Sequence, residues 1–122
     1  MSSTLSNINL FVRDIALSQQ FYTDILGLDL NQEMSAPPHR VVFNAGGCTL
    51  SLQTAESLGE TAAATEGIEL GFEVANIAVA WDRVSRQAAS VGEFQTMGWG
   101  SAFEVRDPDG HRLVVYQRNR RG

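Results

Sequence analysis

The chain has 122 residues, of which 43% are hydrophobic and 19% charged, and its net charge is −5. This composition is typical of one soluble globular domain, and the negative charge disfavours nucleic acid or an anionic membrane as a partner. No apolar run approaches the roughly 18 residues that span a bilayer. The N-terminus is not expected to be a signal peptide, and the single cysteine, Cys48, predicts a reducing, cytoplasmic location.

The first half of the chain predicts one strand, one helix and three short strands. Residues 8–12 are rich in the apolar and β-branched side chains that strands favour. Asp14 is a suitable N-cap for a helix with apolar residues at helical spacing, and Gly27 suits the position just past its end. Further strands are predicted at 28–34, 40–44 and 49–53. Residues 54–66 are small, polar and rich in alanine, which predicts a linker.

The second half repeats this order of elements. Residues 68–74 predict a strand and Asn76 a second N-cap, and Trp81 lies on the core-facing stripe of the helix that follows. Residues 103–117 predict a hairpin around Asp107-Pro108-Asp109-Gly110. In this turn the proline presets φ, the first aspartate accepts from the backbone and the glycine takes a left-handed conformation. Such a turn fixes which side chains of the last strand face inward, and the repeated order predicts two copies of one unit.

Two stretches of the chain resemble the vicinal oxygen chelate superfamily, which includes glyoxalase I, bleomycin-resistance proteins and extradiol dioxygenases. They are the hairpin and the segment Asn9-Leu10-Phe11-Val12-Arg13-Asp14 that leads into Ser18, Phe21-Tyr22 and Leu26-Gly27-Leu28. The resemblance implies an α+β fold of two βαβββ modules, about 5–53 and 67–118, joined by the linker 54–66. The modules would form a half-open β-cup with the helices on its outer face. It also implies a homodimer.

The resemblance further places the metal ligands of the metal-dependent members at inward positions on the first and last strand of each module. In this chain those positions hold Asn7, Ser51, Glu69 and Val114. Transition metals need three or four strongly donating ligands, and an amide, a hydroxyl, one carboxylate and an isopropyl group do not supply them. The two histidines, His39 and His111, are expected elsewhere. No metal and no cofactor are therefore expected.

Strand alternation gives the cup a polar inward face with a few aromatic side chains. With the loop residue Trp99 added, the candidate ligand-binding residues are Asn7, Asn9, Phe11, Ser51, Glu69, Glu73, Trp99, Arg112 and Tyr116. Any of them could instead line a water-filled groove or a subunit contact. Trp99 could stack on a planar or cationic ligand, or pack as a lid on the neighbouring strand. Glu69 is the catalytic candidate, as a general base, unless it forms a salt bridge with Arg112.

Three functions fit these observations. The favoured one is a metal-independent small-molecule binding protein of the glyoxalase/bleomycin-resistance type that sequesters a planar or cationic compound, since the missing metal ligands do not affect that role. The alternative is a lyase, isomerase or dioxygenase-like enzyme that uses Glu69 as general base or sole carboxylate ligand. The third is a regulatory or accessory domain with no ligand of its own.

Overall fold

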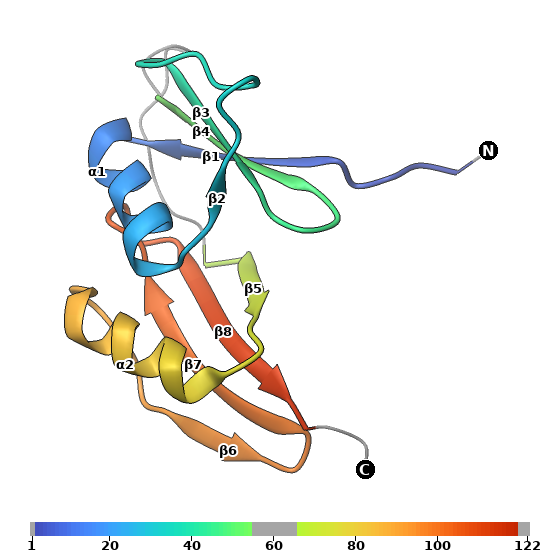
Figure 1. Cartoon of the computed structure of the whole chain (residues 1–122), viewed down its shortest axis with the longest axis vertical. Helices are drawn as coiled ribbons and strands as arrows, with labels where there is room; N and C mark the ends of the chain where they lie inside the picture. The colour runs from blue at the N-terminus through green and yellow to red at the C-terminus, as the bar shows by residue number, and fades with distance from the viewer. Residues whose placement is uncertain (1, 55–65, 120–122) are drawn as a thin grey trace. The chain divides into compact units, whose positions relative to one another are not determined.

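A computed structural model describes residues 2–54 and 66–119 of the chain. The chain divides into two compact units, residues 1–63 and 64–122 (Figure 1). Apart from Thr54 and Glu66, the predicted linker lies outside the described residues. No helix in the described part of the chain is long and apolar enough to cross a membrane.

The first unit has the element order βαβββ, as predicted. Its elements are β1 (Asn7–Val12), α1 (Ile15–Gln20), the π-helical turn η1 (Phe21–Ile25), β2 (Asp29–Leu30), β3 (Arg40–Asn44) and β4 (Thr49–Thr54). The strands form one sheet in the order β1-β4-β3-β2, in which β1 runs parallel to β4 and the other pairs are antiparallel. A parallel pair needs a long crossover connection, and the helical segment with the strands β2 and β3 provides it.

The helical segment of the first unit begins and ends at the predicted residues. Asp14 is the N-cap, and its Oδ1 accepts a hydrogen bond from the Leu17 N–H at 3.1 Å. The last turn widens, because the Leu26 N–H donates to the Phe21 carbonyl five residues back. Gly27 follows with φ of 74°, a conformation that glycine adopts without strain.

The strand predicted over residues 28–34 is much shorter in the structure, where β2 covers only Asp29–Leu30. The side chain of Asn31 ends it, since its Oδ1 accepts from the Met34 N–H at 3.0 Å. The Asn31 carbonyl also accepts from the Ser35 hydroxyl at 2.7 Å. Asparagine competes in this way with the hydrogen bonds of a sheet, and the backbone turns instead of continuing as a strand.

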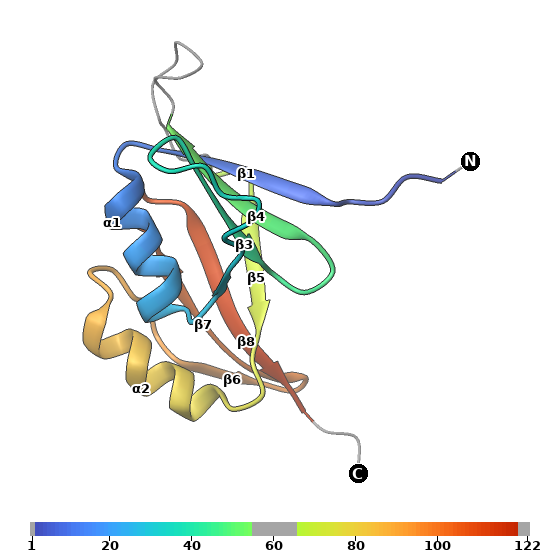
Figure 2. The ribbon, with the colours of Figure 1, turned by 45° about the horizontal axis from the view of Figure 1, so that its top comes forward.

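The second unit repeats the order βαβββ. Its elements are β5 (Glu69–Glu73), α2 (Ile77–Gln87), β6 (Gln95–Met97), β7 (Gly100–Arg106) and β8 (Arg112–Arg118). The sheet order is β5-β8-β7-β6, and β5 runs parallel to β8. In both views of the ribbon, α2 lies along one side of this sheet (Figures 1 and 2). The two units therefore share one topology, and the predicted internal repeat is confirmed.

Helix α2 covers the apolar face of the second sheet. Asn76 caps it by accepting from the Val79 N–H, and Gln117 on β8 accepts from the Ile77 N–H at 2.8 Å, which satisfies a second donor of the first turn. The Trp81 ring packs edge-on against the rings of Phe103 and Phe94, with centroids 5.0 and 5.5 Å away. Trp81 is therefore a packing residue, as its helical spacing predicted.

The turn between β7 and β8 has the predicted hydrogen bonds. Asp107 Oδ1 accepts from the N–H groups of Asp109 and His111 at 3.0 and 2.9 Å, and Gly110 adopts φ of 89°. The antiparallel register that follows sets Arg106 opposite Arg112. This register fixes the face of the sheet on which each side chain of β8 lies.

The turn between β6 and β7 requires glycine at one position. A Cβ on Gly100 would overlap the carbonyl oxygen of Gln117 and lie 2.9 Å from the Cα of Arg118, both in the backbone of β8. A Cβ on Gly98, two residues earlier, would meet nothing within 4 Å. The backbones of β7 and β8 therefore approach each other at Gly100 more closely than a side chain allows.

We expect Gly100→Ala to lower the free energy of unfolding by about 3 kcal/mol, because β8 must shift to admit the methyl group. Gly98→Ala is the matched control and should change it by less than about 0.5 kcal/mol. Urea unfolding of the parent and both variants measures the difference. Equal stability of the two variants would show that the close approach at Gly100 is not a constraint on the fold.

Candidate functional site

Four polar side chains on one face of the first sheet are joined by hydrogen bonds among themselves. Asn7 Oδ1 accepts from the hydroxyl groups of Thr49 and Ser51 at 2.7 and 2.9 Å, and Asn7 Nδ2 donates to Asn9 Oδ1 at 3.2 Å. Ser51 is fully buried, and this bond satisfies its hydroxyl. Phe11 lies further along the same strand, opposite Gln53. The structure thus brings together Asn7 and Ser51, two of the positions that the resemblance assigned to metal ligands, and they bind each other.

The second sheet presents a different polar face on the side away from α2. By strand alternation it consists of Glu69, Gly71 and Glu73 on β5, Arg112, Val114 and Tyr116 on β8, and Ala102, Glu104 and Arg106 on β7. Glu69, Arg112 and Arg106 form the row near the β7–β8 turn, whereas Glu73, Tyr116 and Ala102 form the row at the other end. The row between these two consists of Gly71, Val114 and Glu104. This face has two chemically distinct ends.

The aromatic end is formed by Trp99 and Tyr116, whose rings meet edge to face with centroids 6.0 Å apart. Trp99 is 48% exposed. Its backbone is fixed by Asn119, whose N–H donates to the Trp99 carbonyl at 2.8 Å and whose side chain donates to the Gly98 carbonyl at 2.9 Å. The Tyr116 ring packs over Gly71, where a Cβ would lie only 3.2 Å from the ring. The result is a half-exposed indole on a backbone that is fixed by hydrogen bonds.

Glu73 lies next to this aromatic pair, but its charge is already compensated. Arg118 donates to both carboxylate oxygens, at 2.8 and 2.9 Å. The hydrogen bond and the charge of Arg118 hold the pKa of Glu73 below its ordinary value, and the carboxylate raises the pKa of Arg118 in return. A cationic ligand would have to compete with Arg118 for this carboxylate.

At the charged end, two arginines share two carboxylates. Glu66 accepts from Arg106 at 2.9 Å and from Arg112 at 2.8 Å, and Glu104 Oε1 lies 3.1 Å from Arg112 Nε. The hydrogen bond and the charge of Arg106, followed by the contribution of Arg112, lower the pKa of Glu66. Arg112 therefore has Glu66 and Glu104 as its ion-pair partners in the described part of the chain, and not Glu69.

Glu69 is exposed at the start of β5, and no ion pair among residues 2–54 and 66–119 includes it. Along its strand the next residue on the same face is Gly71, which lies opposite Val114. Neither can transfer a proton or bind a metal. The alternative of a Glu69–Arg112 salt bridge is not found, and the carboxylate has no charged partner in the described ranges.

The four positions that hold metal ligands in the family do not form a transition-metal site in this chain. Asn7 and Ser51 are neutral and hydrogen-bonded to each other, while Glu69 has the isopropyl group of Val114 as its diagonal neighbour. Within the described ranges, no group of three or more histidine, cysteine, aspartate or glutamate side chains could hold a metal ion. The donor atoms at these four positions therefore do not fit the transition-metal ion that the resemblance to the metal-dependent members implies.

His111 has a structural partner. Its Nδ1 lies 2.7 Å from Oδ2 of Asp107, whose side chain is completely buried, and the imidazole is only 13% exposed. The hydrogen bond to Asp107 raises the pKa of His111, and the charge of the aspartate acts in the same direction. His111 therefore belongs to the turn that fixes the register of β8 and lies outside the polar face.

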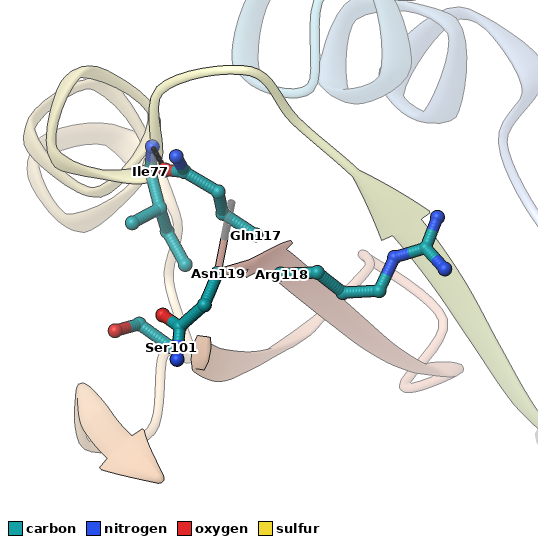
Figure 3. Close-up of a pocket in the computed structure, with 5 residues that line it drawn as sticks. All are labelled: Ile77, Ser101, Gln117, Arg118 and Asn119. Atoms are coloured by element: carbon teal, nitrogen blue, oxygen red, sulfur yellow. Dashed lines mark hydrogen bonds between the residues drawn. The ribbon is translucent and has the colours of Figure 1, made fainter. Parts of the chain in front are cut away.

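A shallow pocket of about 200 Å³ lies beside the first turn of α2, where Ile77, Ser101, Gln117, Arg118 and Asn119 line it (Figure 3). The dashed line in Figure 3 is the hydrogen bond from the Ile77 N–H to Gln117. No predicted site residue lines this pocket. Its backbone donor is already paired, and the guanidinium of Arg118 is bound to Glu73. The pocket therefore offers a ligand fewer free polar groups than the face described above.

A family model described as the Glyoxalase/Bleomycin resistance protein/Dioxygenase superfamily matches residues 4–115. The chain therefore belongs to this superfamily, as its resemblance to the vicinal oxygen chelate proteins implied. Comparison with curated proteins finds no significant match.

Several solved structures share the fold over nearly the whole chain. A protein of unknown function from Agrobacterium tumefaciens str. C58 is 24% identical with a TM-score of 0.79, covering 98% of this chain and 97% of that one. A lactoylglutathione lyase from Agrobacterium tumefaciens is 18% identical (TM-score 0.74, coverage 96% and 95%). TnmS3, an antibiotic binding protein from Streptomyces sp. CB03234, is also 18% identical (TM-score 0.74, coverage 98% and 98%). At these identities the similarity shows the fold alone.

The His111–Asp107 pair should make stability depend on pH. The pKa of His111 is higher in the folded state than in the unfolded state, where it is about 6.5. The pair therefore contributes fully to the free energy of unfolding below about pH 6.5, and this contribution is lost as pH rises through the folded pKa. We expect the free energy of unfolding of the parent to fall between pH 6 and pH 9. In His111→Gln this pH dependence should be weaker, and the free energy of unfolding at pH 6 should be about 1–2 kcal/mol lower than in the parent. Urea unfolding at several pH values measures both effects.

His39→Gln, at an exposed position in the first unit, is the matched control and should keep the parent's pH dependence. A fall of the same size in His111→Gln and in the parent would contradict the assignment of that dependence to the pair.

Proposed function

We propose that the protein is a metal-independent small-molecule binding protein that holds a planar compound against Trp99, and that it acts as a homodimer in the cytoplasm. The observation that carries this proposal is the exposed indole, fixed by Asn119 and flanked by Tyr116. A large aromatic side chain at the surface gains free energy when a second flat surface covers it. Because the backbone at Trp99 is already ordered, ligand binding does not lose the conformational entropy of an unordered loop.

The geometry favours a planar ligand over a cationic one. Glu73, which lies opposite Tyr116, accepts hydrogen bonds from two of the three guanidinium nitrogens of Arg118. Glu69 is exposed but lies four residues away from Glu73 along β5, roughly 13 Å in an extended strand. Stacking on Trp99 therefore supports the proposal more strongly than charge attraction does.

The alternative function is an enzyme that uses Glu69 as general base or sole carboxylate ligand. Its supporting observation is the exposure of Glu69 on the same face as Tyr116. Arg112 lies directly opposite Glu69 but is paired with Glu66 and Glu104, and the next neighbours, Gly71 and Val114, offer no second proton-transfer group, so the geometry supports this function less. One of the similar structures is a lactoylglutathione lyase and another is an antibiotic binding protein. The fold is thus compatible with an enzyme and with a binding protein, and it does not favour one over the other.

We expect planar aromatic compounds to quench the emission of Trp99. The chain has two tryptophans, so the variant Trp81→Phe leaves Trp99 as the sole reporter. Proflavine, which is cationic, and pyrenebutanol, which is neutral, are suitable probes because both are flat. Trp99→Ala should weaken binding about tenfold or more, a factor typical of losing one stacking partner. The fluorescence of the probes themselves measures affinity in that variant.

Val79→Ala is the matched control, since Val79 is exposed on α2 in the same unit. It should bind both probes like the parent. The proposal is wrong if neither probe binds, or if Trp99→Ala and Val79→Ala bind equally well.

Binding should not need a metal ion. Treatment with a chelator should leave the affinity for pyrenebutanol unchanged, and so should Glu69→Gln, because neither removes a group that contacts the indole. Elemental analysis of protein purified without chelator provides the second measurement. A stoichiometric transition metal that is retained by the parent and lost in Glu69→Gln would instead favour the enzyme.

A further inference from the structure

We infer that Arg106 and Arg112 form a binding site for a ligand carboxylate, which the side chain of Glu66 fills in the absence of ligand. This inference rests on the proposed function for the other end of the ligand, since it assigns the compound on Trp99 an acidic group. The ligand class is then a planar aromatic acid whose carboxylate is separated from the ring by a flexible spacer.

The two arginines are placed to share one carboxylate. They lie directly opposite each other on β7 and β8, where like charges repel unless an anion lies between them. Glu66 supplies that anion. Its Oε1 lies 2.9 Å from Arg106 Nη1 and its Oε2 lies 2.8 Å from Arg112 Nη2. Arg106 Nη2 also donates to Glu66 Oε2 at 3.4 Å, so Arg106 holds both carboxylate oxygens in the bidentate arrangement that arginine favours, and Arg112 binds one of them as well.

The arginines are held in place by groups other than Glu66. Arg106 Nη1 also donates to the Gly110 carbonyl at 3.1 Å, which ties it to the rigid β7–β8 turn. Arg112 Nε lies 3.1 Å from Glu104. Both arginine side chains are largely covered, with 26% and 34% exposed, whereas the side chain of Glu66 is 67% exposed. When Glu66 leaves, Arg106 keeps its hydrogen bond to the Gly110 carbonyl and Arg112 keeps its ion pair with Glu104, although the buried Arg112 Nε has no hydrogen-bond partner in the described part of the chain.

The charge balance permits the exchange. Two arginines face two carboxylates, Glu66 and Glu104, so a ligand carboxylate that replaces Glu66 restores the same balance. No buried charge is left unpaired, and Glu66 is released to water, where an exposed carboxylate is well solvated. The affinity for the acid is then limited by competition with the tethered Glu66.

The arginine pair and the indole share one face of the second sheet. Arg112 and Tyr116 are four residues apart on β8, which corresponds to about 13 Å between their Cα atoms. The row between them consists of Gly71 on β5, Val114 on β8 and Glu104 on β7. An alkyl spacer could cross this row over Gly71 and Val114, on the side away from the Glu104 carboxylate.

The competing explanation is that Glu66 only fastens the segment before β5 to the hairpin. The two explanations differ in what the neutral variant Glu66→Gln does to binding. If Glu66 is a purely structural partner, its removal does not improve the affinity for any compound. If it occupies a ligand site, its removal strengthens the binding of acids and leaves neutral compounds unaffected.

The experiment compares pyrenebutyrate with its neutral analogue pyrenebutanol on the full chain, with ligand fluorescence as the readout. We expect the parent to bind the acid more tightly than the alcohol, and this advantage to shrink as salt is raised. Glu66→Gln should bind the acid roughly two- to fivefold more tightly than the parent, the factor that corresponds to an exposed ion pair. Arg112→Gln should weaken the acid about fivefold or more and leave the alcohol unchanged.

Glu93→Gln, an exposed glutamate of the same unit outside the cluster, is the matched control and should behave like the parent. Urea unfolding checks that each variant is folded. Equal affinity for acid and alcohol in the parent and in Glu66→Gln would overturn this inference while leaving the proposed function intact. Failure of both compounds to bind would overturn both.

Discussion

The carboxylate of Asp107 determines more of this structure than any other group. It is completely buried, accepts from the backbone N–H groups of Asp109 and His111, and lies 2.7 Å from the His111 ring nitrogen. A buried carboxylate needs such partners, and these hydrogen bonds stabilise the observed conformation of the turn. That conformation sets the register of β7 on β8 and places Arg106 opposite Arg112. A slip of one residue would move every side chain of β8 to the opposite face.

This chain keeps the fold of the superfamily but not the side chains that bind a metal in its metal-dependent members. Each unit keeps the βαβββ order and the parallel pairing of first and last strands, which brings Asn7 near Ser51 and Glu69 near Val114. The topology therefore still gathers the four positions in pairs, but the side chains there cannot bind a transition metal. In the second unit we propose binding groups instead at the two ends of the strands, with an indole at one end and an arginine pair at the other. A fold can thus keep its geometry while its site changes chemistry.

Local patterns in the sequence predicted most of the fold. Helix caps, the turn glycines and the Asp107 turn depend on a few neighbouring residues, and the structure has them where they were expected. The exception is β2, which Asn31 ends early through side-chain hydrogen bonds that a strand pattern does not reveal. The charged end of the site was only partly predictable. Arg112 was predicted on the inward face, whereas Arg106 and Glu104 were not named, and Glu66 reaches the arginines from a segment that composition assigned to a linker.

The central claim is that this chain binds a flat ligand on the β5–β8–β7 face without a metal. The most direct measurement is a ¹H–¹⁵N NMR titration of metal-free protein with pyrenebutyrate. The account predicts shifts of the Trp99 indole N–H, of the Gly71 amide beside Tyr116, and of the Arg112 guanidinium. Unchanged signals at these three residues, with shifts confined to Asn7, Ser51 and their neighbours in the first sheet, would contradict it.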